Sequence, residues 1–149
     1  MSTKPGTANN ETAVRELING LMKAVSAKNI DDLMACYAPD TLMFDIAPPL
    51  QSEGRELVKK SLTEWFPTWE GPIRFEIHNL RVTADQYIAY ATGLQRIRGT
   101  KMDGEKPDIW FRSTFCLKII DGAWRIAHEH TSTPFYMDGS NRAAVDLKP

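Results

Sequence analysis

The second half of the chain is a series of strand-length segments that are separated only by turns. Residues 73–82, 87–98, 109–120 and 124–133 are rich in β-branched and aromatic residues, and short turn sequences divide them. The clearest of these is Asp121–Gly122, because an Asp-Gly pair here joins two segments that both alternate. Consecutive strands joined by short turns pair antiparallel. The sequence therefore predicts one antiparallel sheet.

The first half is predicted to be mainly helical. Residues 11–28 carry apolar side chains at steps of three and four, which is the pattern of an amphipathic helix. A shorter helix is expected at 30–37 with Asn29 as its N-cap, and a third at 55–66. A strand at 41–47 lies between these two helices. Helices followed by such a sheet describe an α+β domain, in which about three helices cover the concave face of a curved antiparallel sheet and leave a cavity.

Length and composition indicate one domain and exclude two classes of partner. A chain of 149 residues is most simply a single domain. Its formal net charge is −1, from 18 basic and 19 acidic residues without a basic run, so no nucleic-acid partner is expected. No apolar run approaches the ~20 residues that span a bilayer, so no membrane partner is expected either. Residues 1–10 are predicted to be a disordered tail and residues 136–149 a C-terminal tail.

The two cysteines bear on where the protein works. Cys36 and Cys116 are far apart in the sequence and lie within apolar patterns. Two reduced, buried thiols are the simpler interpretation, and they favour a cytoplasmic protein.

The last expected strand carries ionisable residues where a core strand would not. Alternate side chains of a strand share one face, so one face is predicted to hold Trp124, Ile126, His128, His130 and Ser132. This face is apolar at one end and polar at the other, as if the strand ran from the core into a pocket. The other face, which includes Glu129 and Thr131, is predicted to meet solvent or a second subunit.

Several roles are open for these residues. The two histidines are acid/base or orienting groups, or hydrogen-bonded structural histidines. A metal site is not predicted, because no third ligand stands at a recognisable spacing. Asp45 lies among apolar neighbours in its strand, where desolvation would raise its pKa and make it a proton donor or acceptor; the alternative is a solvent-facing aspartate. Tyr37 and Trp65 are interpreted as aromatic walls of the core or pocket.

Two stretches resemble a known superfamily. They are Ala27–Asp45 and the closing run Asp121–Phe135, which contains His-Glu-His-Thr-Ser-Thr-Pro-Phe. Both are similar to the nuclear transport factor two-like superfamily, in its SnoaL-like and ketosteroid isomerase-like branch, and the resemblance covers residues 11–135. It implies a cone-shaped curved sheet closed by helices around a largely apolar pocket, and a homodimer formed through the outer sheet face. On this resemblance, Asp45 falls where the isomerases have their proton-shuttling base.

The resemblance also has departures that limit what it implies. Leu21 stands where the isomerases have an oxyanion-hole tyrosine, and their second oxyanion-hole acid falls near Thr114 or Phe115, neither of which is acidic. Steroid isomerisation is therefore not expected. Scytalone dehydratase, a relative, eliminates water with pocket histidines and an aspartate. The calcium/calmodulin-dependent kinase association domain closes with a similar strand but assembles subunits.

The sequence therefore favours a pocket for a small, mainly apolar molecule. The first hypothesis is a cofactor-independent lyase, isomerase or hydrolase that uses acid/base chemistry. Asp45 and His130 are its predicted catalytic residues, and the predicted ligand-binding residues are His128, Ser132, Tyr37 and Trp65. The alternatives are a ligand-binding module without catalysis and a dimeric assembly domain.

Overall fold

The computed structural model describes residues 7–149 and has the expected α+β architecture. Three helices come first: α1 (Thr7–Ser26), α2 (Ile30–Met34) and α3 (Arg55–Trp65). A short 3-10 helix, η1 (Phe66–Thr68), follows α3. Residues 1–6 of the predicted N-terminal tail lie outside the described residues, and residues 7–10 belong to α1, which begins earlier than expected.

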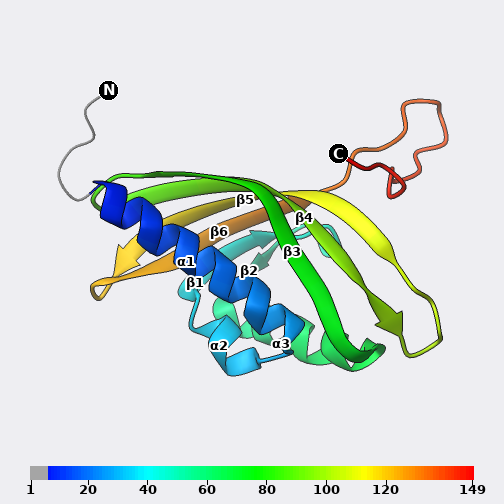
Figure 1. Cartoon of the computed structure of the whole chain (residues 1–149), viewed down its shortest axis with the longest axis horizontal. Coiled ribbons are helices and arrows are strands. Elements are labelled where there is room, and N and C mark those ends of the chain that lie inside the picture. The colour runs from blue at the N-terminus through cyan, green and yellow to red at the C-terminus, as the bar shows by residue number, and fades with distance from the viewer. Residues whose placement is uncertain (1–6) are drawn as a thin grey trace.

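The sheet has six strands in the order β2-β1-β6-β5-β4-β3. The strands are β1 (Tyr37–Phe44), β2 (Ser52–Glu53), β3 (Trp69–Ala84), β4 (Ile88–Lys101), β5 (Asp108–Ile120) and β6 (Ala123–Ser132). All neighbours pair antiparallel except β1 and β6, which are parallel. Figure 1 shows this sheet curving around α1, with α2 and α3 near one end of that helix. The predicted curved sheet with helices on its concave face is confirmed, with the sheet open rather than closed.

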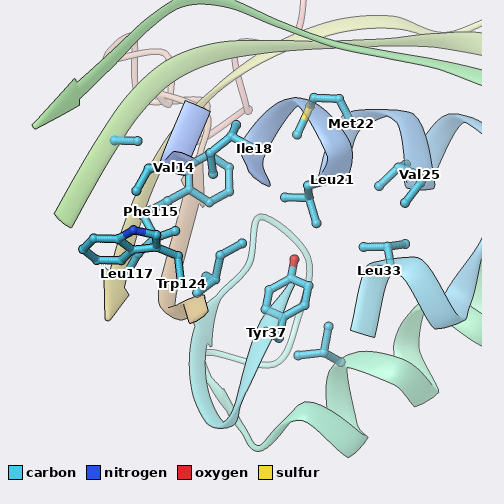
Figure 2. Packing of buried hydrophobic residues seen from close by; sticks show 14 of the residues in the cluster. Val14, Ile18, Leu21, Met22, Val25, Leu33, Tyr37, Phe115, Leu117 and Trp124 are labelled. Atoms are coloured by element: carbon cyan, nitrogen blue, oxygen red, sulfur yellow. The ribbon is translucent and has the colours of Figure 1, made fainter. Parts of the chain in front are cut away.

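The sequence predicts the three helices, although not all of their boundaries. The apolar stripe of α1 packs against the sheet, which removes it from water. Val14, Ile18 and Leu21 of α1 are all buried, and Figure 2 shows them facing the same core as Phe115 and Leu117 of β5. The Asn29 side chain accepts a hydrogen bond from the Asp32 backbone N–H at 3.1 Å, which confirms the predicted N-cap.

The predicted boundaries of the second helix and of the first strand are wrong. The helix ends at Met34, and Tyr37 begins β1 instead of closing the helix. The strand begins at Tyr37 because this residue already pairs with β6, where it lies opposite Ile126. This pairing places the Tyr37 side chain in the core, where it is 3% exposed.

Two glycines of β4 let large side chains lie flat on the sheet. A Cβ at Gly99 would lie 3.0 Å from the Trp69 ring, and one at Gly93 would lie 2.6 Å from the Ile77 side chain. Register shifts in β3, between Glu70 and Arg74 and again between His78 and Arg81, accompany the curvature. The curved inner face thus has room for the helices and also for a cavity.

The segment after β6 turns back on itself beyond the end of the sheet (Figure 1). The Ala144 N–H donates to the Pro134 carbonyl at 2.7 Å, and Ala144 is buried. Val145 and Leu147, in the same segment, are exposed. No helix among residues 7–149 is long and apolar enough to cross a membrane. Cys36 and Cys116 are both free, and they are half-buried rather than fully buried.

Candidate functional site

The inner face of the sheet and the helices enclose a cavity of about 550 Å³. Its walls are mainly apolar and come from every layer of the fold. Leu21 of α1 and Trp65 of α3 form part of one side, and Trp69, Phe75 and Phe111 of the strands form part of the other. Cavities of this size and character are typical of small-molecule sites. Trp65 and Tyr37 therefore lie where the sequence placed them, on the cavity wall.

A buried carboxyl group faces this cavity from β6. Glu129 is 9% exposed, and its Oε1 accepts a hydrogen bond from the Tyr37 hydroxyl at 2.9 Å. Burial among apolar walls raises the pKa of Glu129 from its ordinary 4.5 to about 7. The bond from Tyr37 acts in the opposite direction, and the charge of Asp45 adds to the increase. Glu129 is therefore a group that can release or take up a proton near neutral pH.

Tyr37 is the hydrogen-bond donor in its contact with Glu129. Burial, together with the neighbouring charge of Glu129, raises the pKa of the Tyr37 hydroxyl well above its ordinary value. The hydroxyl stays protonated and can donate to the carboxyl group. Figure 2 shows the Tyr37 ring in the hydrophobic cluster with Leu21 and Leu33. Apolar Leu21 thus stands at the position where the isomerases have their tyrosine. The phenolic hydroxyl of this cavity comes from Tyr37 of β1.

A second carboxyl group lies at the mouth of the cavity. The Thr131 hydroxyl donates to Oδ1 of Asp45 at 3.0 Å, and the Ile46 N–H donates to the same Oδ1 and to the Thr131 hydroxyl, both at 2.9 Å. Asp45 lines the cavity but is exposed, so the fully apolar setting expected for it is not found. Since Thr131 is two residues from Glu129 on the same strand face, one strand holds both carboxyl groups in place.

The expectation that His128, His130 and Ser132 face the cavity is wrong. Pairing between β5 and β6 shifts by one residue: Leu117 lies opposite Ile126, but Cys116 lies opposite His128, which leaves Ala127 as an extra residue. A residue inserted in this way reverses the alternation of the side chains that follow it. Trp124 and Ile126 face the core as predicted. After the bulge, Glu129 and Thr131 face inward instead of the histidines.

The histidines lie on the outer face of the sheet. Nδ1 of His128 is 2.7 Å from the Leu42 carbonyl oxygen, and the Phe44 ring packs edge-on against both imidazoles, with centroids 4.8 Å from His128 and 5.5 Å from His130. His130 is exposed and lines a separate, shallow hollow together with Asp45 and the loop after it. Of the predicted site residues, only Asp45 lines both the main cavity and this shallow hollow.

Three buried polar residues that line the cavity were not predicted from the sequence to do so: Glu129, Thr131 and Gln95. No residue type in β6 marks Ala127 as a bulge, so Glu129 and Thr131 had no sequence signal of their own. Gln95 did have one, because it shares a face of β4 with Ala89, Ala91 and Ile97, all of them buried. No group of three or more His, Cys, Asp and Glu side chains within residues 7–149 is placed to hold a metal ion.

Comparison with known proteins assigns the chain to a family. A family model described as the SnoaL-like domain matches residues 14–136. The chain belongs to the SnoaL-like domain family. An NTF2-like protein of unknown function from Pseudomonas putida KT2440 is 32% identical, with a TM-score of 0.87, and the alignment covers 96% of this chain and 99% of that one.

More distant structures share the SnoaL-like fold. A proposed scytalone dehydratase from Novosphingobium aromaticivorans DSM 12444 is 19% identical, with a TM-score of 0.73 and 89% of each chain covered. A ketosteroid isomerase-like protein from Erwinia carotovora atroseptica SCRI1043 is 18% identical, with a TM-score of 0.71, covering 83% of this chain and 95% of that one. A comparison with curated proteins found no match.

Proposed function

We propose that this SnoaL-like domain binds a small, mainly apolar molecule in its cavity and catalyses a proton transfer on it, with Glu129 as the acid/base. The observation that carries the proposal is the buried Glu129 carboxyl, which is held by Tyr37, faces an apolar cavity and has its pKa raised to about 7. A group whose pKa is close to the working pH both takes and returns a proton efficiently. Such perturbed groups in a cavity are typical of catalytic sites.

The proposed reaction class is an elimination or an isomerisation. In both, a base takes a proton from a carbon atom of the substrate, and the electron pair left behind forms a new double bond or moves onto a carbonyl oxygen. Glu129 takes this proton and, once protonated, returns it to another atom of the substrate or to a leaving hydroxyl group. Dehydration and isomerisation are also the reactions named in two of the structures with this fold.

In this proposal, Asp45 and Thr131 are positioning residues. The Asp45 charge raises the pKa of Glu129, and Thr131 ties Asp45 to the cavity mouth. Replacing Asp45 with Asn should therefore move the pH profile of the reaction to lower pH, in addition to any loss of rate. His130, His128 and Ser132 have no part in the proposed chemistry, because they lie on the other face of β6.

The proposal is tested by proton exchange, which requires no knowledge of the natural product. The exchange of the acidic C–H protons of 2-tetralone, a small apolar ketone, is followed by NMR in D₂O. The wild type should accelerate the exchange, and Glu129→Gln should lower the rate by about 10²-fold or more. The matched control is Glu70→Gln, because Glu70 is exposed and does not line the cavity.

Two results would contradict the proposal. One is an equal rate in the wild type and in Glu129→Gln, which would remove Glu129 from the chemistry. The other is saturable binding of 2-tetralone without exchange in any variant, which would favour a ligand-binding module.

We also propose that two copies of the chain pair through the outer face of the sheet. Ile88 and Tyr90 on the outer face of β4 are 68% and 53% exposed in the single chain, and Trp110 of β5 lies on the same face. A second copy would cover these apolar side chains. Sedimentation at micromolar concentration should give the mass of a dimer, and a monomer would contradict this pairing.

A further inference from the structure

Gln95 is a buried polar side chain without a hydrogen-bond partner among residues 7–149. It is 2% exposed, lies on the inner face of β4 and lines the cavity. Within residues 7–149 its carboxamide makes no hydrogen bond to another side chain or to the backbone. Buried amides nearly always have a partner, since leaving one unpaired costs free energy. Because Gln95 lines the cavity, a molecule bound there would supply the partner that the carboxamide lacks.

The buried hydroxyls of β5 and β6 on this face do not compete for Gln95. Ser113, which lies between Thr131 and Gly93 in the sheet, donates its hydroxyl to the Gly93 carbonyl at 3.3 Å. Thr131 is engaged with Asp45 and Ile46. Both hydroxyls are therefore satisfied by the protein, and the carboxamide of Gln95 is left as a free donor and acceptor.

The register of the sheet separates Gln95 from Glu129. Glu129 lies opposite Phe115 of β5, Phe111 is four residues further along β5, and Gln95 lies opposite Phe111. The two Cα positions are thus two strands and four residues apart, or about 10 Å across and about 13 Å along the sheet. Aromatic side chains lie near this path: the Phe75 and Phe111 rings are 6.2 Å apart, and Phe111 is the direct neighbour of Gln95. A ligand that meets both polar groups must carry an apolar body between two polar ends.

We propose that Gln95 is the specificity-determining residue of the cavity, and that the ligand is a neutral, elongated aromatic molecule with an amide, carbonyl or hydroxyl group at the end remote from Glu129. This inference deepens the proposed function and rests on it. A carboxamide both donates and accepts, which suits neutral polar groups. An anionic end is disfavoured, because Lys101 is the only cationic residue among residues 7–149 that lines the cavity, and its Nζ already donates to the Thr68 hydroxyl at 2.7 Å.

The test compares two probes of nearly the same shape. 2-Naphthamide has a neutral amide on an aromatic body, and 2-isopropylnaphthalene replaces this amide with an apolar group. Dissociation constants are measured by tryptophan fluorescence for the wild type, for Gln95→Met and for the control Gln86→Met, which changes an exposed glutamine. Gln95→Met should weaken the binding of 2-naphthamide about tenfold while leaving 2-isopropylnaphthalene unchanged or bound more tightly. Gln86→Met should bind both probes as the wild type does.

Three results would overturn the inference. They are an unchanged affinity of Gln95→Met for 2-naphthamide, an equal loss for both probes, and the absence of saturable binding of 2-naphthamide to the wild type. Gln95→Leu serves the same comparison if the methionine variant does not fold, as judged by circular dichroism. Because the readout is binding alone, it is independent of proton exchange: a failure of the Glu129 chemistry would leave the preference that depends on Gln95 in place.

Discussion

Strands β5 and β6 lie side by side at the centre of the sheet, yet only one of them follows the simple alternation of a strand. In β5, Ser113, Phe115 and Leu117 are buried and the residues between them face outward, as the sequence predicts. In β6 the buried set is Trp124 and Ile126 and then, after the extra residue Ala127, Glu129 and Thr131. The regular strand supplies the core, and the interrupted strand supplies the functional groups. One inserted residue thus decides which side chains the cavity receives.

The largest expected effect is a difference in stability between variants of the two residues of one cross-strand pair. Phe115 of β5 lies opposite Glu129 of β6, and its side chain is fully buried. Phe115→Ala should lower the free energy of unfolding by about 3–5 kcal/mol, because it leaves a cavity in the core. Glu129→Gln keeps the shape of the side chain, so the free energy of unfolding should change by less than about 1 kcal/mol at pH 5. Urea unfolding of both variants checks this, and similar losses would mean that Glu129 is also a stability residue.

The next effect is a dependence of stability on pH that arises from β6 alone. Below pH 4.5, Glu129 is protonated in both the folded and the unfolded chain. Between 4.5 and about 7 the unfolded chain releases this proton and the folded chain keeps it, since burial raises the pKa to about 7. The free energy of unfolding should therefore fall as the pH rises through this window, by on the order of 3 kcal/mol from this group.

Urea unfolding at pH 5 and pH 8 measures this effect as a difference between two proteins. Glu129→Gln cannot titrate, so it should lose less stability than the wild type between these pH values and should be the more stable protein at pH 8. Equal pH dependence in the two proteins would show that Glu129 does not titrate in this range. Glu70→Gln, on the exposed surface, should behave as the wild type does.

The smallest expected effect concerns a residue that was predicted from the sequence to be catalytic. His130 is exposed on the outer face, so His130→Ala should change the free energy of unfolding by no more than about 0.5 kcal/mol. It should also leave proton exchange of 2-tetralone unchanged, because its imidazole does not line the main cavity. A loss of exchange in His130→Ala that matches the loss in Glu129→Gln would show that the two faces of β6 are not functionally separate.

Much of the architecture could be predicted because it depends on local patterns. The stripe of α1, the Asn29 cap and the alternation of β5 each depend on residues within a few positions of one another, and each is confirmed. Tyr37 was expected on the cavity wall and lies there, although it was assigned to the end of a helix rather than to the start of a strand. The boundaries of the domain at residues 11 and 135 stay predictions.

The fold class, the helices and the four antiparallel strands β3 to β6 could be predicted from the sequence, since hydrophobic periodicity and turn chemistry are properties of neighbouring residues. The resemblance added the expectation of a largely apolar pocket. Which polar side chains enter that pocket depends on how β6 pairs with its two neighbouring strands. Strand β6 pairs with β5 on one side, where Ala127 is an extra residue, and with β1 on the other, where the register shifts between Tyr37 and Leu42. Because a strand repeats every two residues, this single insertion exchanged the histidines for Glu129 and Thr131. Burial then gave Glu129 the pKa on which the proposed chemistry depends.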